Sequence, residues 1–135
     1  MRVPSPVSLR RATAATRFSP LIATAFGHAL IATEDPSHLD EAERVLRQAV
    51  ARDDQNPTAW VQLGTAYEAS GDSARAALAT AERASMTGDH RTAAQSAAFA
   101  LASITPNTPD WIRAQDIAMT ARNDIEDYPK KYKRK

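Results

Sequence analysis

The chain of 135 residues is 43% apolar and 24% charged, carries a formal net charge of +1 and has no cysteine, which suits one ordinary soluble domain. Alanine occupies 28 positions against 4 glycines and 6% aromatic residues, so the composition favours helices and argues against a β-sandwich or β-barrel. Without cysteine the chain lacks disulfides, thiolate nucleophiles and cysteine-based zinc sites, and no stretch reaches the roughly 18 apolar residues of a membrane-spanning helix.

The charges divide into two basic ends and an acidic body. Residues 1–19 contain four arginines and no acid, and residues 130–135 contain five lysines or arginines. All 16 acids lie in residues 20–129, together with eight arginines. We expect residues 1–19 to form a flexible basic segment and residues 123–135 a solvated basic tail. In the alternative interpretation, the chain is a free-standing adaptor whose basic ends contact nucleic acid or an anionic membrane.

Apolar residues recur at intervals of three and four from residue 20 onward, which predicts six helices. The first covers about residues 20–33. The second starts near Ser37, which resembles a capping box with Asp40, and runs to about residue 50. It presents one apolar stripe, consisting of Leu39, Ala42, Val45, Leu46, Ala49 and Val50. Two i,i+4 ion pairs are expected to support it, namely Asp40 with Arg44 and Glu43 with Arg47.

The third predicted helix has clear signals at both ends. Asn56 is its expected N-cap and Pro57 its first residue, because the first helical position needs no N–H donor. Gly71 is expected to end it. One face of this helix carries Trp60, Leu63, Gly64 and Tyr67.

Similar signals delimit the last three helices. Asp72 is expected to cap a fourth helix over about residues 73–87. The pair Gly88–Asp89 repeats this arrangement before a fifth helix over about residues 90–104. A sixth helix is predicted over about residues 110–122, after the breakers Pro106, Asn107 and Pro109. Its inward face is predicted to carry Trp111, Ala114, Ile117, Ala118 and Ala121.

Short links between helices of about 14 residues make successive helices antiparallel. Two helices with their turns then span about 34 residues, a period typical of α-solenoids. We therefore predict an all-α fold in which residues 20–122 form an α-solenoid of about three antiparallel helical hairpins.

Residues 57–88 resemble a tetratricopeptide repeat (TPR) through Trp60, Leu63, Gly64, Tyr67, Gly71, Asp72 and Ala76. Small residues at two of these positions let the helices of a hairpin approach, and the large side chains fill the space between hairpins. The later half departs from the pattern at Thr80, Arg83 and Gly88. Residues 20–56 resemble a preceding repeat with a three-residue insertion, through Phe26, Gly27, Leu30, Ala42, Leu46 and Ala49. Residues 90–122, with Trp111, resemble a degenerate third repeat.

A closer resemblance is carried by residues 27–36, 39–42, 76–82 and 111–117. These segments resemble the C-terminal repeat domain of BepA-like bacterial envelope zinc metallopeptidases. The resemblance implies an HExxH catalytic domain followed by TPR hairpins that hold outer-membrane substrates or assembly partners, of which this chain contains only the second part. Residues 1–19 match nothing in that family. The resemblance further implies a periplasmic location and a role in outer-membrane protein quality control.

The first 33 residues also imitate a signal peptide, with Arg10–Arg11 similar to a twin-arginine pair. Gly27 and His28 interrupt the apolar run, and the second helix would have an uncovered stripe if this segment were removed. We therefore read residues 20–33 as a helix. The location is then periplasmic by resemblance, and cytoplasmic if the chain is expressed as it stands.

The sequence shows no pattern for catalysis. A zincin needs two histidines one helical turn apart with a glutamate beside the bound water, and no such triplet occurs. His28 is predicted in a helix, and His38 and His90 in two separate turns, which argues against a shared metal. The acid pairs Asp53–Asp54 and Glu126–Asp127 flank helix ends, where solvated acids are common. We expect no enzymatic activity, no metal site and no cofactor.

The remaining hypothesis is a binding surface. The first helix of each hairpin is expected to line a concave groove through Leu21, Thr24, His28 and Ile31, and through Thr58, Val61, Thr65 and Glu68. An extended or helical apolar segment of a protein partner would suit these residues. In the alternative, Leu21, Ile31 and Val61 pack against the N-terminal segment or a partner domain. A separate metallopeptidase domain is a second candidate partner. Nucleic acid is not an expected partner, and the sequence leaves the oligomeric state open.

Overall fold

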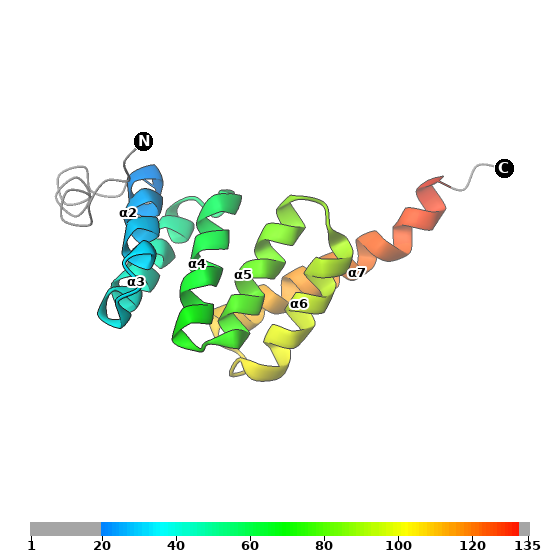
Figure 1. Ribbon diagram of the computed structural model, residues 1–135. Helices are drawn as coiled ribbons and strands as arrows, with labels where there is room; N and C mark the ends of the chain where they lie inside the picture. Colours follow the sequence, from blue (N-terminus) through cyan, green and yellow to red (C-terminus); the bar gives the residue numbers. More distant parts are fainter. Residues whose placement is uncertain (1–19, 133–135) are drawn as a thin grey trace. The chain divides into compact units, whose positions relative to one another are not determined.

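The computed structural model describes residues 20–132, and side chains from Leu21 to Asp127. Over that range the chain is all-helical, with six helices and no strand, as predicted (Figure 1). The helices are α2 (Pro20–Ala32), α3 (Pro36–Arg52), α4 (Pro57–Ser70), α5 (Ser73–Met86), α6 (His90–Ser103) and α7 (Pro109–Tyr132). They belong to two compact units, divided between Asp72 and Ser73.

Several predicted helix ends are confirmed. Asn56 caps α4, its side-chain oxygen accepting from the N–H of Ala59 at 3.3 Å, and Pro57 follows at the start of the helix. Gly71 closes α4 with a left-handed φ of 84°, a conformation that glycine adopts without a Cβ penalty. Asp89 caps α6 by accepting from the N–H of Thr92 at 3.1 Å.

Other ends differ from the prediction. The N-cap of α3 is Asp35, whose carboxylate accepts from the N–H of Ser37 at 2.9 Å, so the capping box of Ser37 with Asp40 is wrong. Pro36 explains the difference, because its fixed φ suits the first helical position. His38 and His90 consequently lie in the first turns of α3 and α6 rather than in separate turns.

The last helix continues well past the predicted end at Arg122 and reaches Tyr132. Asp124 lies in this continuation, with its carboxylate 3.4 Å from Nδ1 of His90 in α6. The polar composition after Arg122 was interpreted as a solvated tail. A polar segment can extend a helix when a neighbouring helix offers a partner, and here the continuation runs through Pro129.

The first unit is built around α3. Phe26 and Leu30 of α2 share a buried cluster with Val45 of α3 and Ala66 of α4. At Gly27 the backbone of α2 lies so close to α3 that a Cβ would stand 2.5 Å from Cγ of Leu46. The helix α2 contacts both α3 and α4. Because the links 33–35 and 53–56 are short and each reverses the chain, α2 and α4 run parallel as neighbours (Figure 1).

The two predicted ion pairs within α3 are not formed among the described side chains. Arg47 instead donates from Nε to the hydroxyl of Tyr67 in α4 at 2.6 Å, and its guanidinium carbon lies 5.5 Å from the centroid of that ring. Glu43 accepts a hydrogen bond from the hydroxyl of Ser70, also in α4. The partly buried contact of Arg47 with Tyr67 is preferred because an exposed ion pair within one helix contributes only about 0.2–0.5 kcal/mol.

The second unit packs α5, α6 and α7 around alanine side chains. Ala81, Ala97 and Ala114, one from each helix, are completely buried in its cluster. The inward face predicted for α7 is confirmed at Ala114, Ile117, Ala118 and Ala121, while Trp111 is partly buried against the cluster. Two ion pairs join α5 to α7: Arg75 with Asp110 at 2.9 Å, and Glu82 with Arg113.

The cap of α6 predicts an acid dependence of stability. Hydrogen bonds from the side chain and the N–H of Thr92 lower the pKa of Asp89 below its ordinary value of 3.8. Since the folded pKa lies below the unfolded one, this stabilisation is complete above about pH 4 and is lost as the pH falls through the folded value. Asp89→Asn keeps a capping oxygen but cannot titrate. In urea unfolding at pH 6 and pH 3, the variant should lose less stability than the wild type; equal losses would contradict this account.

Candidate functional site

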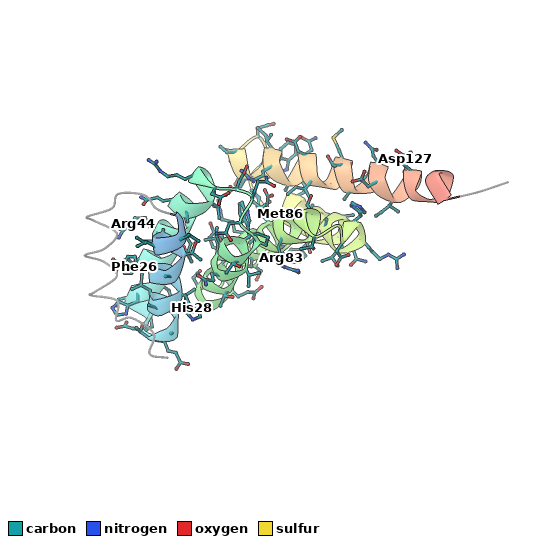
Figure 2. All side chains as sticks on the ribbon, turned by 90° about the horizontal axis from the view of Figure 1, so that it is seen from above. Phe26, His28, Arg44, Arg83, Met86 and Asp127 are labelled. Atoms are coloured by element: carbon teal, nitrogen blue, oxygen red, sulfur yellow. The ribbon has the colours of Figure 1, made fainter. Side chains whose placement is uncertain are left out.

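The eight residues predicted to line a groove lie on α2 and α4, two neighbouring helices of the first unit. On α2, Leu21 is 76% exposed, whereas Thr24 is buried and Ile31 is half-buried against the core. His28, which is labelled in Figure 2, is exposed. On α4, Val61 is 48% exposed. The other three members on α4 are also exposed, namely Thr58, Thr65 and Glu68. Thr24 and Ile31 therefore serve the core more than the surface.

We call the exposed members of this set, Leu21, His28, Thr58, Val61, Thr65 and Glu68, the α2–α4 face. It combines two branched apolar side chains with hydroxyls, one imidazole and one carboxylate. The hydroxyl of Thr65 donates to the carbonyl of Val61 in its own helix at 3.0 Å, so it needs no ligand to be satisfied. The arrangement can bury apolar side chains of a ligand, and it holds no pair of groups set up for proton transfer.

Charge is segregated in the first unit. Residues 20–43 and 53–74 contain no lysine or arginine, so His28 is the one side chain on α2 and α4 that can become a cation. The basic residues of the described part of this unit are Arg44, Arg47 and Arg52, all on α3.

Acidic groups gather at one end of the α2–α4 face. Glu34 follows the C-terminus of α2 and Glu68 lies in the last turn of α4; both are exposed. Because α2 and α4 are parallel, both C-terminal ends, with their partial negative charge, point the same way. The face is therefore apolar toward Leu21 and Val61 and electronegative toward Glu34 and Glu68.

The repeat-signature residues are structural. Gly27, Ala42, Trp60, Leu63, Tyr67 and Ala76 are buried, and Gly64 and Trp111 are partly buried. Trp60 is 4% exposed and donates from Nε1 to the carbonyl of Asp54 at 2.8 Å. The six buried residues are not available to a ligand.

The histidines have separate surroundings. His28 is exposed on α2, Nδ1 of His38 is 2.8 Å from the hydroxyl of Thr33, and His90 faces Asp124. Between Pro20 and Tyr132, no three His, Cys, Asp or Glu side chains gather where they would hold a metal ion. The acid pairs Asp53–Asp54 and Glu126–Asp127 are exposed. None of the described helices is long and apolar enough to cross a membrane.

Two features were not predicted as candidate surfaces. An open hollow of about 330 Å³ lies on α3, lined by Asp40, Glu43, Arg44, Arg47 and Gln48. The sequence pattern suggested that four of these residues pair along the helix, and the contacts of Glu43 and Arg47 with α4 appear only in three dimensions. The second feature is the acidic end of the α2–α4 face, which depends on α2 and α4 being parallel neighbours.

Comparison with protein-family models, with curated proteins and with solved structures finds no match to this chain. Two predictions concern parts outside the described side chains: the flexible basic segment 1–19 and the phosphate contacts of Lys130–Lys135.

Proposed function

We propose that this chain is a non-catalytic protein-binding module whose α2–α4 face holds an apolar segment of a partner protein. The observation that carries the proposal is the exposure of Leu21 and Val61, at 76% and 48%, on two parallel neighbouring helices. Apolar side chains grouped on adjoining helices are a common basis for binding a peptide segment, because covering them removes their surface from water.

The proposed architecture is a TPR-like solenoid of about three hairpins. In the first unit α2 contacts α3 and α4, and in the second α5 contacts α6 and α7, and this packing of neighbouring helices within each unit supports the proposal. The close approach at Gly27 supports it further, since a small residue lets two helices of a hairpin nearly touch.

The proposed context is the one that the sequence resemblance implies. The chain would supply the substrate- or partner-binding C-terminal part of a BepA-like zinc metalloprotease, acting in the periplasm on outer-membrane proteins. Residues 27–36 and 111–117 support this assignment by their similarity to that family's repeat domain. The catalytic HExxH domain would then be contributed by another part of the gene product or by another chain.

A titration with labelled peptides from an unfolded outer-membrane protein tests the binding proposal. The double variant Leu21→Ser with Val61→Ser should weaken binding about tenfold or more, because each serine removes most of the apolar area offered to the ligand. Fluorescence anisotropy measures the affinity. Thermal unfolding should be nearly unchanged, since both side chains are exposed.

Met119→Ser is the matched control, because Met119 is 56% exposed on α7 and lies in the other unit. It should leave peptide affinity unchanged. Equal weakening by the control, or no weakening by the double variant, would contradict the proposed face. Chelator-sensitive cleavage of the same peptides by the purified chain would contradict the non-catalytic assignment.

A further inference from the structure

We infer that the partner segment held by the α2–α4 face carries arginine or lysine beside its apolar residues, and that this cation binds at the C-terminal ends of α2 and α4. The inference deepens the proposed function, on which it rests, by naming the chemistry of the ligand. Four observations support it: the charge of the two helices, the position of Arg47, the direction of the helix dipoles and the backbone conformation at Glu34.

The α2–α4 face has an unbalanced charge. The helices α2 and α4 contain no lysine or arginine. Glu34, which follows α2, and Glu68, in the last turn of α4, are both exposed. Neither carboxylate takes part in an ion pair within the described part of the chain. A lysine or arginine of a ligand therefore meets no competing lysine or arginine from either helix.

The arginines of the first unit that the structure describes all lie on α3. Arg47 approaches α4, but its Nε donates to the hydroxyl of Tyr67 at 2.6 Å and its guanidinium lies against that ring. Tyr67 is 5% exposed, so this contact belongs to the packed side of α4, whereas Glu68 lies on the exposed side. The contact between α3 and α4 thus leaves the carboxylate of Glu68 accessible to a ligand.

The helix ends have the same sign of charge as the two glutamates. Because α2 and α4 are parallel neighbours, both C-terminal ends lie at the end of the face that carries Glu34 and Glu68. Each C-terminus has a partial negative charge of about half an elementary charge, which stabilises a cation placed beside it. Arginine suits this position best, because its planar guanidinium donates two parallel hydrogen bonds to a carboxylate.

Glu34 has a backbone conformation that its side chain does not favour. Its φ is 55°, in the left-handed region, and its N–H bonds to the carbonyl of Ile31 at 3.1 Å. Gly71 makes the same contact to the carbonyl of Glu68 at the end of α4, also at 3.1 Å. A residue with a Cβ is strained at such a φ, and strain of this kind is common at positions that serve a function. The conformation is therefore consistent with a carboxylate retained for binding.

The dimensions of the face set the spacing of the ligand's groups. Val61 and Glu68 are two helical turns apart on α4, which is about 10 Å at 1.5 Å per residue. The 13 residues of α2, with Leu21 near its start, extend over about 20 Å. An extended segment rises about 3.3 Å per residue. An apolar side chain and a cation about three to six residues apart in such a segment therefore match the face.

Three fluorescein-labelled peptides test the inference against the full chain. They share two leucines and differ only at two positions five residues further along, which are occupied by arginine, glutamine or glutamate. Fluorescence anisotropy is measured at pH 8, where imidazole groups are ordinarily neutral. The arginine peptide should bind about fivefold more tightly than the glutamine peptide, as expected for two exposed charge contacts, and the glutamate peptide should bind most weakly.

Glu34→Gln with Glu68→Gln should abolish the preference for arginine over glutamine and leave the affinity for the glutamine peptide unchanged. The matched control, Asp53→Asn with Asp54→Asn, removes the same charge from exposed positions of the same unit, before the N-terminus of α4. It should keep the preference. Salt at 0.5 M should reduce the preference in the wild type, because exposed charges are then screened. A preference that persists in the glutamate variant, or that the control abolishes equally, overturns the inference.

Glu34→Gly separates the charge from a role in the fold. It should raise Tm by about 3 °C, because glycine adopts a φ of 55° without a Cβ penalty. It should also reduce the preference for arginine about twofold, since one of two carboxylates is removed. An unchanged preference, or a lower Tm, would contradict the assignment of Glu34 to ligand binding.

The two proposals fail separately. Equal binding of all three peptides that is lost in Leu21→Ser with Val61→Ser retains the proposed function and overturns only the inference. A preference for arginine that needs the glutamates but neither Leu21 nor Val61 supports the cation site and contradicts the apolar contact of the proposed function. Binding of none of the peptides contradicts both. Thermal unfolding of the glutamine variants checks that the fold is intact, since both glutamates are exposed.

Discussion

Trp60→Ala is expected to lower the free energy of unfolding by about 3–5 kcal/mol. The ring is 4% exposed, and its Nε1 donates to the carbonyl of Asp54 at 2.8 Å, in the link that joins α3 to α4. Truncation removes the buried ring surface and leaves that carbonyl without its indole donor. Against a total stability of about 5–15 kcal/mol, the loss should appear as a large drop in the urea midpoint and in Tm.

Two further variants separate the causes. Trp60→Phe keeps most of the ring volume and removes the N–H donor, so its loss should be about 1–3 kcal/mol. Trp111→Ala truncates a ring that is only partly buried, and should cost less than Trp60→Ala. Similar losses for the two tryptophans would show that burial is not what gives Trp60 its effect.

Gly27→Ala is expected to destabilise the chain by about 1–3 kcal/mol through overpacking. This sign is opposite to the usual one, since replacing glycine by alanine inside a helix normally stabilises it by roughly 0.5–1 kcal/mol. The new Cβ would lie 2.5, 2.7 and 2.9 Å from Cγ, Cδ2 and Cδ1 of Leu46. Leu46 is fully buried and cannot swing into solvent, so the two helices would have to separate.

A double-mutant cycle checks this cause. Leu46→Ala alone should cost about 2–5 kcal/mol, because it leaves a cavity between α2 and α3. It also removes the three atoms that the new Cβ would meet. In that background Gly27→Ala should no longer destabilise, giving a favourable interaction energy in urea unfolding. Additive losses would mean that the strain at Gly27 has another source.

Local signals were sufficient for most helix ends. Asn56 followed by Pro57, Gly71 and Asp89 were all located correctly from their neighbours, because a cap is a contact between residues two or three apart. The predicted start of α3 was wrong because two capping patterns overlap in the sequence. The helix begins with Asp35 as its cap and Pro36 as its first residue, not with Ser37 as its cap.

Where a side chain has two possible partners, only the packed helices decide which one it contacts. Arg47 has Glu43 within reach on its own helix, and the sequence favours that pair. The fold brings Tyr67 to 2.6 Å, and this partly buried partner is preferred. The continuation of α7 likewise forms a contact that the sequence pattern does not reveal, since Asp124 meets His90 only when α6 and α7 lie together.

For the α2–α4 face, the predicted repeat architecture selected the first helix of each hairpin, and helical periodicity selected the positions three and four apart along it. It could not separate Thr24, which is buried, from Leu21, which is 76% exposed, because both lie on the same predicted stripe. The number and type of elements, most of their caps and the absence of lysine and arginine from two of them were determined by the sequence. Which side chains face water, and that two acidic helix ends adjoin, were decided by the tertiary structure, because exposure depends on which neighbour covers each residue.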